Sequence, residues 1–180
     1  MTEAELKELY DVYWQEVPVG SGYDGYVRAK GCLEEKIEFD SVLDVGCGNG
    51  SAVEIFTQAG KKVMGVEYSH WLVETWIKKK FPKNNIIEGD ASELPFPDNS
   101  FDLVFCSEVL EHLPEEKVYK ALGEMYRIAR KYFYGSVCYR QDERGKYHLT
   151  IQPKEWWQKA FERVGFIPIK VKEGIHFYKK

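Results

Sequence analysis

A glycine-rich turn after an apolar strand is the segment of this chain best suited to hold a small molecule. Gly46, Gly48 and Gly50 lie within five residues, directly after an apolar run that contains Asp44. Glycine adopts the positive φ that such a reversal needs, and it lets a ligand approach backbone that a Cβ would block. The turn therefore predicts a cofactor site at the start of the helical segment 51–59.

The residues around the turn distinguish two kinds of cofactor. A dinucleotide-binding turn places its third glycine three residues after the second, and Ser51 stands at that position. Asp44 is poorly placed for a pyrophosphate, but it can accept a hydrogen bond, direct or through water, from an ammonium group. These features favour a cofactor that carries an amino acid, such as S-adenosylmethionine, over a nicotinamide dinucleotide.

Two further acids follow apolar strands at the same interval along the chain. Glu67 ends the strand 62–67, Asp90 follows the strand 85–89, and 23 residues separate Asp44 from Glu67 and Glu67 from Asp90. This interval is about one strand and helix, so the three carboxylates lie near the carboxyl ends of neighbouring parallel strands. Glu67 suits ribose hydroxyls and Asp90 an adenine amino group, although each acid alone could be a helix cap.

The ordered motifs together resemble the class I S-adenosylmethionine-dependent methyltransferases, in particular the type-11 branch with the ubiquinone and menaquinone C-methyltransferases. The likeness covers roughly residues 40–140. It rests on the segments 42–50, 66–69, 88–102 and 107–113.

This resemblance implies roles for the matching residues. The backbone of 46–48 meets the methionine end, Glu67 holds the ribose, Tyr68 flanks the adenine and Asp90 reads its edge. The implied cofactor-binding set is Asp44, Gly46, Cys47, Gly48, Gly50, Glu67, Tyr68, Asp90, Ala91, Cys106 and Ser107. The product is S-adenosylhomocysteine. Acceptors in the branch range from quinones and sterols to sugars, amines and arsenicals, so the small-molecule acceptor stays open.

Aromatic residues crowd the segment before the first strand. Tyr10, Tyr13, Trp14 and Val17 recur at helical spacing, which is typical of a stripe that packs a helix on the sheet. Alternatively the segment is a lid, because aromatic faces stabilise a cation such as a sulfonium. The predicted acceptor-binding residues are Tyr13, Trp14, Tyr23, Tyr26 and His148.

Two residues are candidates for catalysis, His148 and Glu108. His148 lies in the segment 140–152, which we expect across the mouth of the site from the N-terminal lid. His112 is expected to cap or pack the helix after Pro114, and His176 lies on a terminal strand with no expected partner.

Length and composition favour one domain over residues 1–180, with an N-terminal helical lid (1–40), a cofactor-binding core (41–140) and an acceptor loop, last helix and hairpin (141–180). The 44% hydrophobic content is enough for a sizeable core, and a net charge of −4 argues against nucleic acid bound through phosphates. The four cysteines have no metal or redox spacing, so no metal site is predicted. Without a signal-like or membrane-spanning segment, the expected location is cytoplasmic.

The alternation of strands and helices predicts an α/β fold, a Rossmann-like, doubly wound, mostly parallel seven-stranded sheet with a C-terminal antiparallel hairpin. We expect strands at 41–46, 62–67, 85–89, 101–107 and 132–139, and a hairpin of 166–171 with 175–178. Helices are expected at 2–16, 26–36, 51–59, 70–80, 115–130 and 153–164, with a glycine-rich link over 18–25.

Two other kinds of protein remain open at this point. One is a protein methyltransferase or a catalytically silent subunit that needs a partner to complete its site, and the other, less favoured, is a nicotinamide oxidoreductase. The oligomeric state is not readable from the sequence.

Overall fold

The computed structural model of the chain describes residues 1–17, 23–81, 85–172 and 174–180, with residues 23 and 24 described by their backbone alone. Seven strands form one sheet in the order β3-β2-β1-β4-β5-β7-β6. The strands β1 to β5 pair in parallel, and β7 pairs antiparallel with both β5 and β6. Their bounds are Ser41–Val45 (β1), Lys62–Glu67 (β2), Ile86–Glu88 (β3), Phe101–Ser107 (β4), Ala129–Ser136 (β5), Ile167–Lys172 (β6) and Ile175–Lys179 (β7).

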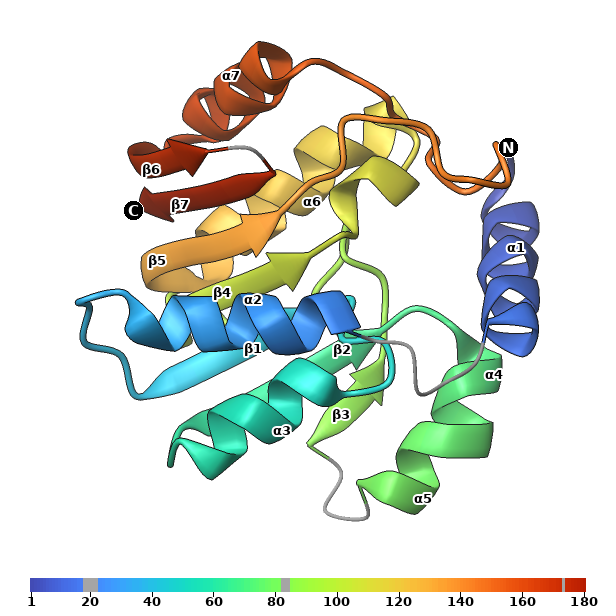
Figure 1. Cartoon of the computed structure of the whole chain (residues 1–180), viewed down its shortest axis with the longest axis horizontal. Helices are drawn as coiled ribbons and strands as arrows, with labels where there is room; N and C mark the ends of the chain where they lie inside the picture. The colour runs from blue at the N-terminus through green and yellow to red at the C-terminus, as the bar shows by residue number, and fades with distance from the viewer. Residues whose placement is uncertain (18–22, 82–84, 173) are drawn as a thin grey trace.

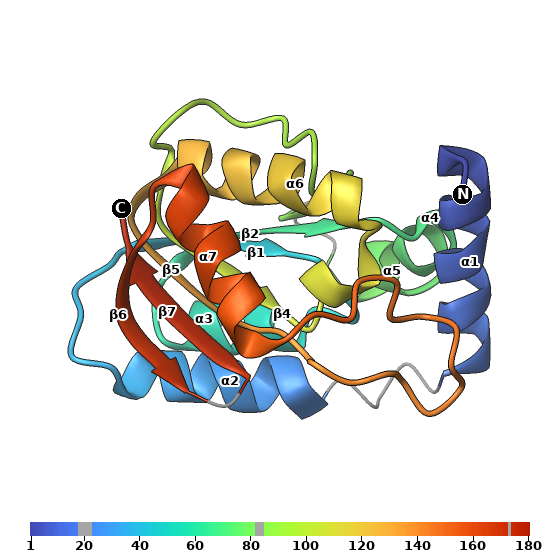
Figure 2. The same cartoon turned by 90° about the horizontal axis from the view of Figure 1, so that it is seen from above.

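Helices cover both faces of this sheet (Figures 1 and 2). On one face α6 and α7 pack through Leu122, Met125, Trp157 and Phe161, and on the other face α2 and α3 pack through residues such as Ala29 and Phe56. The helices are α1 (Glu3–Glu16), α2 (Tyr23–Glu34), α3 (Ser51–Gln58), α4 (His70–Leu72), η1 (Val73–Ile77), α5 (Lys78–Lys80), η2 (Leu110–His112), α6 (Glu115–Ile128) and α7 (Lys154–Val164). The predicted fold class is confirmed.

The helix α1 lies across the carboxyl ends of the parallel strands, away from both covered faces (Figures 1 and 2). It begins with a capping box in which Thr2 and Glu5 bond each other's backbone N–H groups. Leu6 is its only described side chain that is buried. The helix therefore covers the end of the sheet, where ligands bind in open α/β folds.

Several element bounds differ from the sequence-based expectation. The helix α2 begins at Tyr23, inside the predicted link 18–25, and a Cβ at Gly25 would lie 3.7 Å from Ser51 of α3. Residues 18–22 lie outside the described residues. The expected helix 70–80 contains a central π-helical stretch, η1. The strand β5 ends at Ser136 and not at 139, because the amide of Val137 leaves the ladder to bond the carbonyl of Gly174.

Within the described ranges, no helix combines the length and the apolar character needed to cross a bilayer.

Candidate active site

One cavity opens between α1 and the carboxyl ends of β1, β2 and β4, with a volume of about 210 Å³. Eleven of the residues singled out from the sequence line it: Tyr13, Trp14, Gly46, Cys47, Gly48, Glu67, Tyr68, Asp90, Ala91, Ser107 and Glu108. Residues separated by almost a hundred positions in the chain thus meet in one place because the sheet brings its strand ends together.

Other predicted residues lie outside the cavity wall. Cys106 is fully buried behind it, Gly50 faces the ring of Phe81, and Tyr26 is 38% exposed with the Lys30 ammonium over its ring. His148 does not line the cavity itself. The side chain of Tyr23 lies outside the described residues.

Glycine is required at Gly50 and at Gly48 for different structural reasons. At Gly50, where φ is +81°, a Cβ would lie 2.4 Å from the Phe81 ring, so packing alone excludes a larger residue. Gly48, where φ is +53°, lines the cavity. A Cβ there would lie 3.1 Å from the Trp14 indole, which also lines the cavity. Gly48 is therefore the position where the absence of a side chain leaves backbone open to a ligand.

Glu67 is the buried acid of the cavity. Its carboxylate accepts hydrogen bonds from the amides of Gly48 (2.8 Å) and Ser69 (2.9 Å) and from the side chain of Trp14. Burial raises the pKa of Glu67, and these hydrogen bonds work against that rise. The glycine turn and α1 are thus both joined to one carboxylate at the end of β2.

Asp44 lies beneath the turn in β1 and is 2% exposed. Burial, and next the charge of Glu67, raises the pKa of Asp44 to about 8. Among the described residues, no hydrogen-bond donor reaches its Oδ2 atom. An acceptor left this way in the interior costs free energy, and a cationic group above the turn would offset that cost.

Asp90 and Tyr68 form the side of the cavity beside β3. Asp90 accepts from the Lys117 ammonium (2.7 Å) and from the backbone and hydroxyl of Ser92. Burial raises the pKa of Asp90, but these bonds outweigh it and hold the pKa below its usual value. The Lys7 and Lys117 ammonium groups lie over the Tyr68 ring.

The N-terminal helix and the segment 140–152 are in direct contact, although the sequence placed them on opposite sides of the mouth. The Tyr10 hydroxyl donates to the carbonyls of His112 (2.9 Å) and Tyr147 (3.1 Å). The rings of Tyr13 and Tyr147 meet edge to face, and Arg144 pairs with Glu16. The two segments therefore pack against each other at the edge of the cavity, where α1 supplies the lining residues.

The carboxylate of Asp142 organises the segment that carries His148. It accepts from the amides of Arg144, Lys146, Tyr147 and His148, and these bonds outweigh its slight burial and lower the pKa of Asp142. This backbone nest fixes the loop next to η2.

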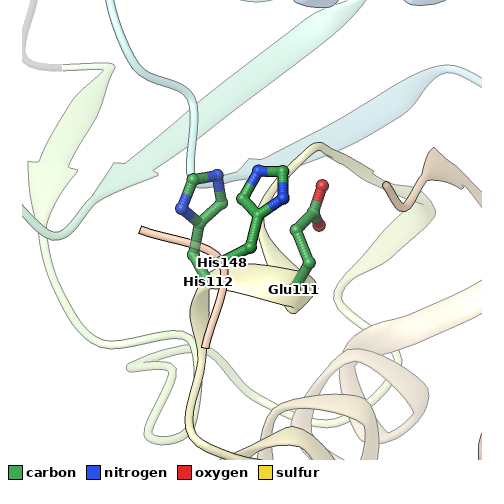
Figure 3. Close-up of side chains that lie close together, drawn as sticks. All are labelled: Glu111, His112 and His148. Atoms are coloured by element: carbon green, nitrogen blue, oxygen red, sulfur yellow. The ribbon is translucent and has the colours of Figure 1, made fainter. Parts of the chain in front are cut away.

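His112 corrects the sequence-based expectation, since it lines the cavity. Its ring lies 4.8 Å from that of His148, edge to face, and Figure 3 shows Glu111 beside the pair. Burial, and next the charge of His148, lowers the pKa of His112 to about 4. His176 also has a partner, because the Tyr139 hydroxyl lies 2.9 Å from its Nε2 and Phe161 stacks on its ring.

Sequence reasoning missed Tyr10, Asn49, Val109 and His112 as cavity residues. The only signal that bears on His112 is its spacing from Glu108 and Glu111, which puts three polar side chains on one short turn. Tyr10 carries no such signal, because its place depends on where α1 docks.

Comparisons with known proteins agree with this geometry. A family model described as a methyltransferase domain matches residues 43–132. The demethylmenaquinone methyltransferase of Renibacterium salmoninarum is 40% identical over 89 residues, which are 49% of this chain and 36% of that protein. The chain spans about a third of the length of such curated relatives.

Two solved structures are similar in fold. The PH0226 protein of Pyrococcus horikoshii has a TM-score of 0.75 at 18% identity, over 96% of this chain and 98% of that one. The methyltransferase solved in complex with the Trm112 methyltransferase activator of Haloferax volcanii has a TM-score of 0.73 at 20% identity, over 89% and 77% of the two chains. The chain thus belongs to the methyltransferase domain family, within the class of S-adenosylmethionine-dependent methyltransferases.

Proposed function

We propose that this chain binds S-adenosylmethionine in the cavity between α1 and the strand ends and transfers its methyl group to a small-molecule acceptor. The observation that carries the proposal is Glu67, a buried carboxylate aimed at the glycine turn from the end of β2. Such a carboxylate accepts hydrogen bonds from ribose hydroxyls. The open backbone at Gly48 and the unpaired oxygen of Asp44 fit the amino-acid end of the same cofactor.

The bound cofactor would supply the reactive methyl group and its own leaving group. The remaining work falls on alignment of the acceptor and exclusion of water, which can contribute about 7–11 kcal/mol through proximity. Tyr13 and Glu108 also line the cavity and are the proposed neighbours of the acceptor. Glu108 and His148 are the proposed catalytic residues, and a cytoplasmic location remains a prediction.

Calorimetry with S-adenosylhomocysteine tests the cofactor assignment, with the reduced nicotinamide dinucleotide as the competing ligand. We expect micromolar binding of the first and none of the second. Gly48→Val should abolish that binding, because the new side chain fills the space between the turn and Trp14. Gly123→Val is the matched control, since a Cβ at Gly123 has nothing within 4 Å. Equal affinity in both variants contradicts the assignment.

The acceptor is found by screening metabolites for release of the demethylated product. With that acceptor, His148→Gln should lower turnover by about 10²–10⁴-fold and leave cofactor affinity unchanged, if His148 handles a proton. A variant with normal turnover assigns His148 a structural role.

The second candidate function is a subunit that is silent or that depends on a partner, because one similar structure contains an activator protein. Cofactor binding without turnover on any metabolite would favour this second candidate.

A further inference from the structure

We propose that Glu111, His112 and His148, assisted by Glu108, bind a divalent transition-metal cation at the acceptor end of the cavity. One ligating atom from each of the first three residues lies within 4.8 Å of the others. Figure 3 shows the two rings and the carboxylate gathered in one place, from η2 and from the loop that Asp142 fixes. The cysteine spacing predicted no metal site, and none of these three residues is a cysteine.

Both imidazole rings are held by a backbone carbonyl at Nδ1. The Nδ1 of His112 lies 3.1 Å from the carbonyl of Tyr147, and the Nδ1 of His148 bonds the carbonyl of Arg140. A carbonyl only accepts hydrogen bonds, so each Nδ1 carries the proton and each Nε2 keeps a lone pair. Backbone carbonyls commonly fix the tautomer of metal-binding histidines in this way.

Glu111 provides an independent reason for a ligand here. Its side chain is fully buried, and its Oε1 accepts from the amide of Cys138 at 2.8 Å. Within the described part of the chain, its Oε2 has no hydrogen-bond donor, and its close polar neighbour is the carboxyl group of Glu108, itself an acceptor. Glu111 is fully buried and Glu108 half-buried, so these two carboxyl groups need a shared proton or a cation between them.

The ligand set indicates which cation fits. Two imidazoles with one or two carboxylates suit Zn²⁺, Mn²⁺, Fe²⁺ or Co²⁺, whereas Mg²⁺ and Ca²⁺ prefer oxygen ligands alone. Ligands bound at about 2.0–2.2 Å lie roughly 3 Å apart, so the side chains need to draw together by no more than about 2 Å.

The site also bears on the acceptor, and this step rests on the proposed function. Glu108 and His112 line the cavity, so coordination positions left open by the protein face the acceptor. An oxygen of the acceptor bound there would lose its proton more readily. The site therefore favours acceptors that present a hydroxyl or enol oxygen over those that present only an amine or a carbon.

The test measures the cation alone, without cofactor or acceptor. Metal-stripped full-length protein is titrated with Co²⁺, followed by visible absorption, and with Zn²⁺ and Mn²⁺ by calorimetry. We expect one Co²⁺ per chain, with absorption bands that indicate nitrogen and oxygen ligands. His148→Asn should weaken the affinity by at least about 10-fold. His70→Asn is the matched control, because this exposed histidine pairs with Glu88 far from the cluster.

Glu111→Gln gives a second, independent reading, since the amide oxygen can still accept from Cys138 while the negative charge is lost. We expect weaker cation binding together with an unchanged melting temperature of the metal-free protein, or a higher one. Absence of a single tight site in the wild type, or equal affinity in His148→Asn and His70→Asn, overturns the proposal. Because no cofactor is present, neither outcome depends on methyl transfer.

Discussion

At the scale of single residues, two buried acids share the end of the sheet below the glycine turn. Glu67 has several hydrogen-bond donors, whereas Asp44 keeps one oxygen without a donor among the described residues. The charge of Glu67 adds to burial in raising the pKa of Asp44. The sequence predicted that both acids lie at strand ends. The 23 residues between Asp44 and Glu67 are about the length of one strand and one helix, so the interval itself indicates the position.

The pKa of Asp44 gives a stability prediction. Its folded-state value of about 8 lies above the ordinary 3.8, so between these values the folded chain holds a proton that the unfolded chain has lost. The contribution of Asp44 to stability therefore falls as the pH rises from about 4 to about 8. Asp44→Asn does not titrate, so its unfolding free energy should fall less than that of the wild type over this range.

Urea unfolding at pH 5 and pH 8.5 measures this difference. We expect the two proteins to diverge by at least about 1.4 kcal/mol, the equivalent of one pKa unit. Parallel pH profiles for the wild type and Asp44→Asn contradict a raised pKa at this position.

Glu67 gives a prediction for binding. Loss of charge-assisted hydrogen bonds of about 1.5–3 kcal/mol should weaken affinity for S-adenosylhomocysteine by roughly 10- to 150-fold in Glu67→Gln. Glu74→Gln, which alters an exposed glutamate paired with Lys78, is the control and should bind as the wild type does. Calorimetry of both variants decides whether Glu67 holds the ligand or only the turn.

At the scale of elements, α1 is attached through ring packing and through several polar contacts. Asp11 accepts from Ser69 and from the amide of Trp71, and Lys7 pairs with Glu88. Such contacts near the surface contribute little stability each. The cavity of about 210 Å³ is smaller than the 300–1,000 Å³ typical of small-molecule sites, and Trp14 takes up part of its room. We therefore expect the helix or this side chain to move when a cofactor enters.

Tryptophan fluorescence tests this movement. Addition of S-adenosylhomocysteine should change the emission of the wild type, because the Trp14 indole leaves its contact with Gly48 and Glu67. Trp14→Phe should lose most of the change, and Trp156→Phe, altered on α7 beside Tyr119, should keep it. If Trp14→Phe keeps the full change in emission and hydrogen exchange in α1 does not change on ligand addition, then α1 only packs on the sheet and does not move.

At the scale of the whole molecule, the cavity lies where the order of strands reverses, between β1 and β4. The sequence predicted this place, because strand ends, glycines and acids follow local periodicity. It could not predict that Tyr10, His112 and Tyr147 meet, since their contacts join segments more than a hundred residues apart. Those contacts couple the N-terminal helix to the acceptor side of the chain.

Tyr10→Phe tests that coupling. The change keeps the ring packed against Tyr68 and His112 but removes the hydroxyl that donates to the carbonyls of His112 and Tyr147. The hydroxyl has a single hydrogen, so the two carbonyls share one hydrogen bond of about 0.5–1.5 kcal/mol, which ties α1 to η2 and to the loop. Without it, amide exchange in α1 and in 142–149 should speed up together, by about 2- to 10-fold. Tyr132→Phe, a strand position outside the cavity, should leave both unchanged. Faster exchange in α1 alone would mean that the helix opens independently of the acceptor loop, and the two would then not form one cover.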